Sequence, residues 1–248
     1  MKPLLVVARV LPEAWERSIK ELWERGVIVE TEYGEKSKDL PAIIVVEEPL
    51  SEPRIHLKGV VAGRLSGLFE YVEEVLSGVN DWRIGKDWHY TYHERLFAYK
   101  VDSRVYDQIS YVVEKLKEAP FSRRAQAITW QPWKDCKTDS PPCLQRVWFR
   151  VVEGKLVMHA HMRSNDALKA AFMNMYAFTE LQRKVAEELG VPVGYYMHVA
   201  DSYHVYERDW KWAEKFAEQV ASGSSRRYWM TTEAFKALAY RARRSSGS

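Results

Sequence analysis

A strand hairpin followed by a long helix and one more strand is the feature that most constrains the fold of this chain. Residues 144–152 and 155–162 have the composition of strands, and Glu153-Gly154 between them is a hairpin signal. From about Asp166 the apolar residues are spaced for one buried helix, which Gly190 is placed to end. A strand at 195–199 follows. Strands beside a long buried helix predict an α+β fold.

The rest of the chain adds further helices and strands to this unit. The aromatic stretch 82–99 has little periodicity, so loop and short strand are expected there. No internal repeat, low-complexity tract or linker divides the 248 residues, which predicts one domain over 1–248. The further helices are expected at about 12–26, 68–76, 105–116 and 210–220, and the further strands at 42–46 and 125–130.

The charge balance and the cysteine count restrict the class of protein. The 37 Lys and Arg residues against 34 Asp and Glu give a formal charge of +3, which does not predict a nucleic-acid or membrane-surface protein. No segment reaches the roughly 18 apolar residues of a membrane span, and no secretion signal is recognisable. Cys136 and Cys143 cannot form a disulfide framework. A soluble, cytoplasmic protein with free thiols is therefore expected.

Arginine residues are the candidate anion-binding groups. The sequence has neither a Walker loop nor a Gly-x-Gly-x-x-Gly turn after a strand, so arginine side chains would have to hold a phosphate. Arg123-Arg124 precedes a predicted strand, and Arg163-Ser164 lies between a strand and the long helix. The second pair is better placed, because a helix N-terminus favours anions. Taken singly, each pair is also compatible with solvated surface charge.

Cys143 is the candidate nucleophile. It follows Ser140-Pro141-Pro142 and precedes a predicted strand, so the stiff approach would fix the direction of the sulfur. A thiol with an ordinary pKa of about 8.5 is mostly protonated at pH 7, and a neighbouring cation such as Arg163 would favour the thiolate. The alternative is that Cys143 is a small buried hydrophobic residue.

Metal and serine-hydrolase sites are weaker alternatives. His159 and His161 alternate onto one face of a strand downstream of both cysteines, but zinc ligands usually come in more closely spaced pairs. No Gly-x-Ser-x-Gly elbow occurs, which argues against a serine hydrolase. We therefore expect no metal site.

Many of these residues stand in the order and spacing of one enzyme family. Between positions 123 and 206 the chain resembles thymidylate synthase without gaps. The resemblance is strong in the C-terminal half and faint in residues 1–100, which are divergent. It rests on an ordered set of landmarks, namely Arg123-Arg124, Pro141-Pro142-Cys143, Gln145, Arg163-Ser164-Asn165-Asp166, Asn174, Asp201, His204 and Tyr206.

The resemblance implies both a fold and a reaction. The fold is a thymidylate synthase-like α+β sandwich with a large mixed sheet and a long buried helix. The reaction is the reductive methylation of deoxyuridylate (dUMP) to thymidylate (dTMP), with methylenetetrahydrofolate as co-substrate and no metal. The Cys143 thiol would add to C6 of the pyrimidine, which divides a difficult substitution into easier steps. The partners implied are dUMP, folate and a second copy of the chain in a homodimer.

The resemblance also assigns residues to the nucleotide. Arg163 and Ser164 would bind the phosphate, and Arg163 would in addition favour the thiolate of the cysteine. Arg123 and Arg124 would reach across the dimer interface to the phosphate in the partner's site. Asn174 would read the base edge through its amide donor and acceptor.

Sugar and folate contacts are implied by the same resemblance. His204 and Tyr206 would bind the deoxyribose hydroxyl, and Asp166 would face the pterin of the folate. Trp82 is expected to border the folate pocket, as is Trp88.

Two further catalytic positions are implied with alternatives. Tyr90 matches a tyrosine of the family that lies near the cysteine, and Tyr92 competes with it for that match. The family's catalytic glutamate lies in a helix ahead of a glycine. Glu70 is nearest, one position out of register, with Glu73 and Glu74 as rivals.

The sequence departs from the family at three places. Leu144 stands where the family has a histidine directly after the cysteine. The family's Arg-Thr/Ser-Gly phosphate loop is missing, and Lys36 or Lys38 is the expected substitute as a point charge. Residues 241–248 contain no apolar residue of the kind that closes over the folate in the family.

Two other functions remain open from the sequence. One is a pyrimidine nucleotide (dCMP or dUMP) hydroxymethylase of the same family, in which water quenches the one-carbon intermediate. Asn174 argues against a cytosine base, for which an acidic reader would be more natural. The other is a non-enzymatic nucleotide- or RNA-binding protein, because the 10 Trp residues offer faces on which bases stack.

Overall fold

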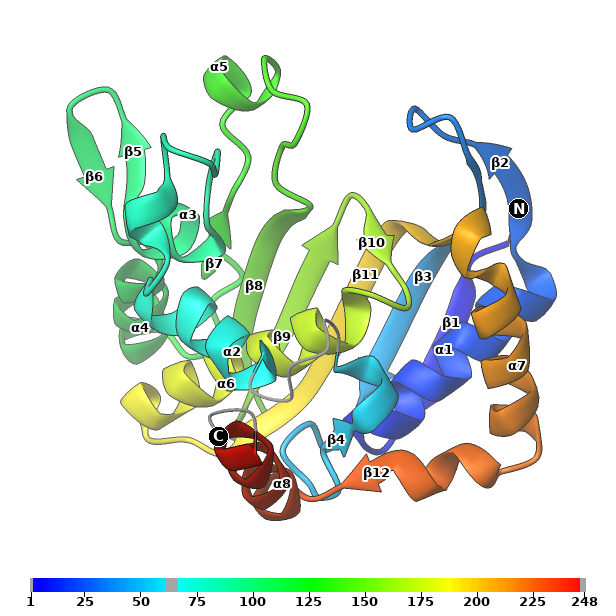
Figure 1. The fold of residues 1–248 in the computed structure, drawn as a ribbon. Coiled ribbons are helices and arrows are strands. Elements are labelled where there is room, and N and C mark those ends of the chain that lie inside the picture. The colour runs from blue at the N-terminus through cyan, green and yellow to red at the C-terminus, as the bar shows by residue number, and fades with distance from the viewer. Residues whose placement is uncertain (1, 61–66, 246–248) are drawn as a thin grey trace.

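A large mixed β-sheet forms the centre of the computed structural model, which describes residues 2–60 and 67–245 (Figure 1). Its spatial order is β1-β3-β11-β9-β8-β7, with β2 paired to β3 and β10 paired to β11. The eight strands are β1 (Leu4–Ala8), β2 (Val27–Glu30), β3 (Lys36–Val46), β7 (Gln126–Ile128), β8 (Leu144–Val152), β9 (Lys155–Met162), β10 (Asn165–Asp166) and β11 (Val193–Tyr206).

Two small two-stranded sheets lie outside the large one. One pairs β4 (Ile55–His56) with β12 (Trp229–Met230), and the other pairs β5 (Tyr99–Val101) with β6 (Arg104–Tyr106). The helices are α1 (Leu11–Arg25), α2 (Gly67–Ser77), α3 (Tyr92–Phe97), α4 (Gln108–Glu118), α5 (Pro132–Asp135), α6 (Ala171–Leu189), α7 (Trp210–Ala221) and α8 (Thr232–Ser245).

The core lies between one face of the large sheet and the helices α1 and α6. Figure 1 shows both helices across the sheet, and α6 is buried on most of its circumference, from Phe172 to Val185. Because β3 has alternate buried residues, such as Leu40 and Ile44, its apolar side chains point into this core. The expected α+β sandwich with a large mixed sheet and a long buried helix is confirmed.

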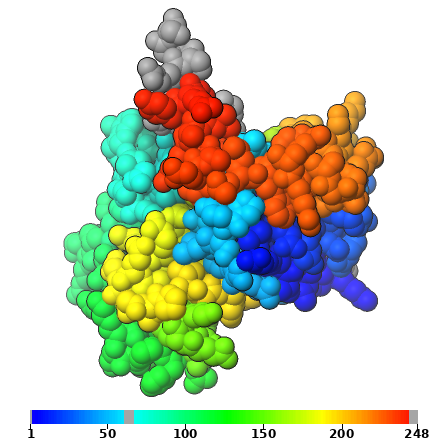
Figure 2. Space-filling model, turned by 90° about the horizontal axis from the view of Figure 1, so that it is seen from below, coloured from blue at the N-terminus to red at the C-terminus, as the bar shows by residue number. Residues whose placement is uncertain are grey.

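Segments from the two ends of the chain pack against each other. Seen from below, the orange and red helices α7 and α8 lie beside blue and cyan N-terminal segments (Figure 2). Phe235 of α8 meets Phe69 of α2 edge-on, with ring centroids 5.5 Å apart. The N-terminal strands β1 and β3 join the same sheet as the C-terminal strand β11. The divergent N-terminal part therefore completes the core.

The predicted hairpin has the bounds expected from the sequence. Strands β8 and β9 are antiparallel, with Val152 paired to Lys155 and Leu144 paired to Met162. Gly154 takes a positive φ of 74° in the turn, a conformation that costs glycine little. The pairing brings the start of β8 and the end of β9 to the same end of the sheet.

Three local differences from the sequence expectation bear on the site. Helix α6 begins at Ala171 and not near Asp166, because Asn165 and Asp166 pair with β11 as a short strand. Strand β11 continues to Tyr206 past an irregularity between Ala200 and Tyr203. The stretch 82–99 contains helix α3, which periodicity missed because it is short.

The opposite face of the large sheet carries exposed apolar side chains. In β1 the residues Leu4, Val6 and Ala8 are buried, whereas Leu5 and Val7 are 64% and 44% exposed. The partly exposed side chains of β3 and β11 that alternate with core residues include Val45 and Val199. These side chains form an apolar, partly exposed face on the side of the sheet away from α1 and α6.

Candidate active site

A cavity of about 790 Å³ opens at the end of the sheet where β8 begins and β9 ends. Its walls come from α2, the segment before α3, the start of β8, the segment between β9 and α6, and the end of β11. The predicted residues that line it are Tyr90, Tyr92, Cys143, Arg163, Ser164, Asp166, Asn174, His204 and Tyr206. It thus collects most of the residues that the sequence proposed, although they span more than a hundred positions.

The hairpin register places Cys143 beside Arg163. The main-chain amide of Arg163 donates to the carbonyl oxygen of Cys143 at 2.9 Å. The Arg163 guanidinium turns back to the loop before the cysteine, donating to the carbonyls of Pro141 at 2.8 Å and Pro142 at 3.0 Å. Arg163 therefore fixes the approach to Cys143 as well as carrying a positive charge.

Two opposing effects act on the thiol of Cys143. Burial raises the pKa of the Cys143 thiol, and the positive charge of Arg163 lowers it, with burial the larger effect. Arg163 was expected from the sequence to favour the thiolate, and its charge does lower the pKa of Cys143. Without a ligand, however, the net pKa of Cys143 is above its ordinary value.

Both tyrosines that competed for one role in the sequence line the cavity. The hydroxyl of Tyr92 accepts a hydrogen bond from the amide of Leu144 at 3.2 Å, next to the cysteine. The rings of Tyr90 and Tyr92 have centroids 5.7 Å apart. Burial, with the nearby Cys143, raises the pKa of Tyr90 to about 12, so its hydroxyl is a donor at neutral pH.

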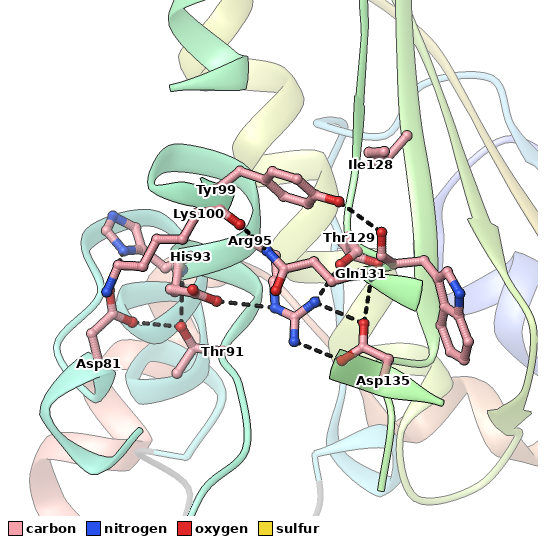
Figure 3. Close-up of polar contacts among 12 residues, drawn as sticks. Asp81, Thr91, His93, Arg95, Tyr99, Lys100, Ile128, Thr129, Gln131 and Asp135 are labelled. Atoms are coloured by element: carbon pink, nitrogen blue, oxygen red, sulfur yellow. Dashed lines mark hydrogen bonds and ion pairs between the residues drawn. The ribbon is translucent and has the colours of Figure 1, made fainter. Parts of the chain in front are cut away.

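A buried ion pair holds this tyrosine segment against the start of β8 (Figure 3). Arg95 of α3, fully buried, makes two hydrogen bonds of 2.8 Å to the carboxylate of Asp135 and one of 2.7 Å to the carbonyl of Thr129. The Thr129 hydroxyl in turn donates to the carbonyl of Leu144. The peptide groups on either side of Leu144 are therefore held by Tyr92 and Thr129.

The far wall of the cavity comes from β10 and the end of β11. Asp166 pairs with His204 across these strands, and Oδ1 of Asp166 accepts from the amides of Leu168 and Lys169 at 3.0 and 2.8 Å. Burial raises the pKa of the Asp166 carboxyl. Tyr206 lies edge-on to His204, with centroids 4.8 Å apart.

Buried polar groups support this wall from behind. The ring of His204 contacts the hydroxyl of Ser202 at 3.2 Å, and that hydroxyl donates to the carboxylate of Asp39. Asn165 accepts from His198 Nε2 at 2.7 Å. Burial lowers the pKa of His198 to about 3, so the His198 ring is neutral at pH 7.

Helices α2 and α6 close the remaining side. The hydroxyl of Tyr71 donates to Oδ1 of Asn174 at 2.6 Å, and both residues line the cavity. Glu74, one turn further along α2, also lines it and accepts from Nδ2 of Asn80 at 2.8 Å. Burial raises the pKa of Glu74.

Comparison with known proteins agrees with this arrangement. A family model described as thymidylate synthase matches residues 70–238. The chain belongs to the thymidylate synthase family. It is 33% identical over 217 residues to the "Putative thymidylate synthase" of Methanosarcina mazei, covering 87% of this chain and 95% of the relative. It is 35% identical over 212 residues to the protein of the same description from Methanocaldococcus jannaschii, covering 82% and 91%.

Some residues expected from the thymidylate synthase resemblance lie away from the cavity lining. Glu70 is exposed, and of the described glutamates on α2 it is Glu74 that lines the cavity. Trp82 is 63% exposed and stacks with cations of its own loop, whereas Trp88 lines the cavity. The reason is local: residues 81–83 form a helical turn that points Trp82 outward.

The basic residues expected at the phosphate also lie partly away from the cavity. Arg123 and Arg124 are exposed, just before the edge strand β7, and neither is among the described residues that line this chain's cavity. Lys38 donates to the carbonyl of Trp23 at 2.8 Å and lies over its ring, so it is engaged elsewhere. Lys36 faces Glu30 at 3.8 Å. Lys169 lines the cavity and pairs with Asp209.

Several lining residues were missed in the sequence. Tyr33 comes from the loop between β2 and β3 and stands edge-on to Tyr206, with centroids 6.1 Å apart. Tyr71 and Lys169 lie on or before helices whose apolar pattern gave no sign of a polar role. A signal was present for Tyr71, since it lies next to Glu70 on the helix where a catalytic residue was sought.

No group of three or more His, Cys, Asp or Glu side chains suited to a metal ion occurs within residues 2–60 and 67–245. His159 instead contacts the hydroxyl of Tyr195 at 2.9 Å, and His161 contacts Asp201 at 2.9 Å.

Of the helices in the described ranges, none has the length and apolar character of a membrane span.

Proposed function

We propose that this protein is a thymidylate synthase that converts dUMP to dTMP through a covalent bond between Cys143 and C6 of the pyrimidine. The observation that carries the proposal is the meeting of Cys143, Arg163 and Asn174 on one cavity with the sugar-facing pair His204 and Tyr206. A covalent reaction on a nucleotide requires a nucleophile, a cation that binds the phosphate, an amide that reads the base and groups that bind the sugar hydroxyl.

The nucleotide would lie along the cavity from Arg163 to Asn174. Arg163 and Ser164 hold the phosphate, and His204 and Tyr206 bind the deoxyribose hydroxyl. Two nitrogens of the Arg163 guanidinium donate to the carbonyls of Pro141 and Pro142 and so hold one edge of the guanidinium against the loop. The phosphate would bind the other edge of the guanidinium.

Covalent catalysis would begin at the sulfur of Cys143. The thiol first gives its proton to water, the thiolate sulfur then forms a bond to C6 of the pyrimidine, and the C5–C6 double-bond electrons move toward C5 and the O4 carbonyl. Arg163 lowers the pKa of Cys143 against the effect of burial, which favours this attack. Tyr90 and Tyr92 keep the loop and its thiol in place from the opposite side.

The remaining lining residues fit a flat, polar co-substrate such as methylenetetrahydrofolate. Asp166 offers a carboxylate at one end, and Trp88, Tyr33 and Met173 offer flat or apolar surface. When bound, the folate supplies the one-carbon unit and the hydride. Burial raises the pKa of Glu74, which suits it to hold or release a proton near the base. We therefore assign to Glu74 the role of the catalytic glutamate, for which Glu70 was the nearest match in the sequence.

A homodimer would complete the site. Leu5 and Val7 belong to an exposed apolar sheet face that a second copy would cover. Arg123 and Arg124 lie at the edge of that sheet and would reach the phosphate in the partner's cavity. The proposal places the enzyme in the cytoplasm, since a thiol nucleophile needs a reducing compartment.

Release of tritium from C5-labelled dUMP tests the proposal. We expect release that depends on methylenetetrahydrofolate, and its absence from the wild-type protein would overturn the proposal. Cys143→Ser abolishes release, whereas Cys136→Ser, at the exposed second cysteine, retains it. The mass of the product separates a methyl group from the hydroxymethyl group that a hydroxymethylase of this family would form.

A covalent trap gives a second readout. With 5-fluorodeoxyuridylate and the folate, we expect a stable adduct whose mass is the sum of the protein and its ligands. The adduct should map to Cys143 and should form in Cys136→Ser but not in Cys143→Ser. A pure binding protein would bind the nucleotide in all three proteins without forming the adduct.

A further inference from the structure

A hydrogen bond between two helices fixes the side chain proposed to read the base. Tyr71 lies on α2 and Asn174 on α6, and these helices pack side by side. The Tyr71 hydroxyl donates to Oδ1 of Asn174 at 2.6 Å, and both residues line the cavity.

The direction of this hydrogen bond decides the orientation of the Asn174 amide, that is, the positions of Oδ1 and Nδ2. A donor–acceptor distance of 2.6 Å is that of a hydroxyl on an oxygen acceptor, and it is short for a bond from an amide nitrogen. Burial, with Glu74, Tyr90 and Cys143 nearby, raises the pKa of Tyr71 well above its ordinary value. Tyr71 therefore remains a donor at any pH at which the protein would work.

Fixing Oδ1 of Asn174 also fixes Nδ2. An amide has an acceptor end and a donor end, and exchanging them requires a rotation of about 180°. That rotation would turn Nδ2, a donor, toward the Tyr71 hydroxyl. Because Asn174 is 6% exposed, a rotated amide would also give up the hydrogen bond that Oδ1 accepts from the Tyr71 hydroxyl.

The two pyrimidine bases present opposite edges to such an amide. Uracil has a donor at N3 and an acceptor at O4, whereas cytosine has an acceptor at N3 and a donor at its 4-amino group. One orientation of the amide satisfies both positions of uracil, and the rotated orientation satisfies both positions of cytosine. An asparagine that is free to rotate would accept either base.

We propose that Tyr71 is a positioning residue that selects a uracil-type base over a cytosine-type base by holding the amide of Asn174 in one orientation. The inference rests on the proposed function, since it takes the nucleotide site as given. It adds Tyr71, a residue on a second helix, to the groups that would set the specificity of that site.

Comparison of dUMP and dCMP binding in wild type and Tyr71→Phe tests the inference. Phenylalanine keeps the ring and removes only the hydroxyl. We expect wild type to prefer dUMP and Tyr71→Phe to lose about five- to tenfold of that preference, chiefly through tighter dCMP binding. For dUMP turnover, KM should rise more than kcat falls.

Tyr99→Phe is the matched control. Tyr99 is also a buried tyrosine, whose hydroxyl donates to the carbonyl of Trp130 at 2.7 Å, away from the cavity. We expect it to leave the ratio of the two dissociation constants unchanged. Thermal unfolding of both variants separates a loss of stability from a change of selectivity.

Each outcome has a distinct meaning. If wild type prefers dUMP and Tyr71→Phe keeps the same preference, the inference is overturned and the proposed function stands. If wild type binds neither nucleotide, the proposed function fails and the inference fails with it. Loss of preference in Tyr71→Phe alone supports both.

Discussion

The main-chain amide of Arg163 donates to the carbonyl oxygen of Cys143 at 2.9 Å, although the two residues are twenty positions apart in the chain. This bond continues the pairing of β8 with β9 past the ends of both strands. The turn at Glu153-Gly154 sets the register as far as Arg146, which pairs with His161, and an irregularity between Arg146 and Leu144 then shifts it by one residue. That shift places Arg163, and not Ser164, opposite Cys143.

Removing the charge of Arg163 is predicted to make Cys143 less reactive. Arg163 lowers the pKa of Cys143, so in Arg163→Gln that pKa rises further and the thiolate fraction at pH 7 falls by up to about tenfold. The measurement is the rate of iodoacetamide labelling of Cys143 against pH, in the Cys136→Ser background. We expect the midpoint to move to higher pH.

Arg146→Gln is the matched control for that experiment, because Arg146 is an exposed arginine of β8. Its labelling profile should match that of the parent protein. A midpoint that stays in place or moves to lower pH in Arg163→Gln would contradict the assigned role of Arg163.

Breaking the buried Arg95–Asp135 pair is predicted to destabilise the protein strongly. Both side chains are 1–2% exposed, so Arg95→Met leaves the carboxylates of Asp135 and of the neighbouring Glu94 buried without their cation. A loss of about 3–5 kcal/mol in the free energy of unfolding is expected, measured by urea denaturation. Arg95→Met/Asp135→Leu should recover part of it, because the double change also removes the buried Asp135 carboxylate and leaves only Glu94, which lies 3.0 Å from Arg95 Nε in the wild type, without its cation.

The exposed pair Arg83–Asp87 supplies the comparison, with side chains 32% and 53% exposed. Arg83→Met should cost about 0–1 kcal/mol, since exposed ion pairs contribute little. Equal costs for Arg95→Met and Arg83→Met would show that the buried pair does not hold α3 to the start of β8.

His198 predicts a loss of stability in mild acid. Its pKa is about 3 in the folded protein against an ordinary 6.5, so the unfolded chain binds the proton more readily. This contribution is fully present above pH 6.5 and is lost progressively as the pH falls from 6.5 toward 3. Between pH 7 and pH 5 it amounts to about 2 kcal/mol.

Urea denaturation of wild type and His198→Gln at the two pH values measures this term. The fall in unfolding free energy from pH 7 to pH 5 should be smaller in His198→Gln by about 2 kcal/mol. His89→Gln, at an exposed histidine, should behave as wild type. The same fall in wild type and His198→Gln would mean that His198 takes up its proton without unfolding.

Mixing two inactive variants tests the shared site of the proposed homodimer. Arg123→Ala/Arg124→Ala retains Cys143, and Cys143→Ser retains both arginines. In a mixed dimer one site has the thiol from one subunit and the arginines from the other, so about a quarter of wild-type activity should return. No recovery on mixing, with subunit exchange demonstrated by mass, would place the arginines outside the partner's site.

The sequence was sufficient where the pattern is local. The hairpin of β8 and β9 was predicted to the residue, because alternation and the Glu153-Gly154 turn act over a few positions. The start of α6 was placed too early, because the pairing of Asn165 and Asp166 with β11 is a long-range contact that leaves no periodic trace. Helix α3 was missed for a different reason, since its six residues are too few to show a helical period.

Some residues of the candidate site were predicted from the sequence, and others were not. The order of landmarks from Arg123 to Tyr206 identified the family, and Cys143, Arg163 and Asn174 do line one cavity. The choice of Glu70 followed proximity in sequence, whereas the helix turns Glu74 toward the cavity and leaves Glu70 exposed. Trp82 was expected to border the folate pocket, but it lies in a helical turn and is exposed.

The sequence by itself determined the family and the chain segments that line the cavity, because those depend on residue types at fixed spacings. Tertiary structure decided which side chains meet. The bond from Tyr71 to Asn174 and the ion pair from Arg95 to Asp135 join residues 103 and 40 positions apart. Such pairs form only when helices and strands pack, since packing supplies both the distance and the burial that make each hydrogen bond specific.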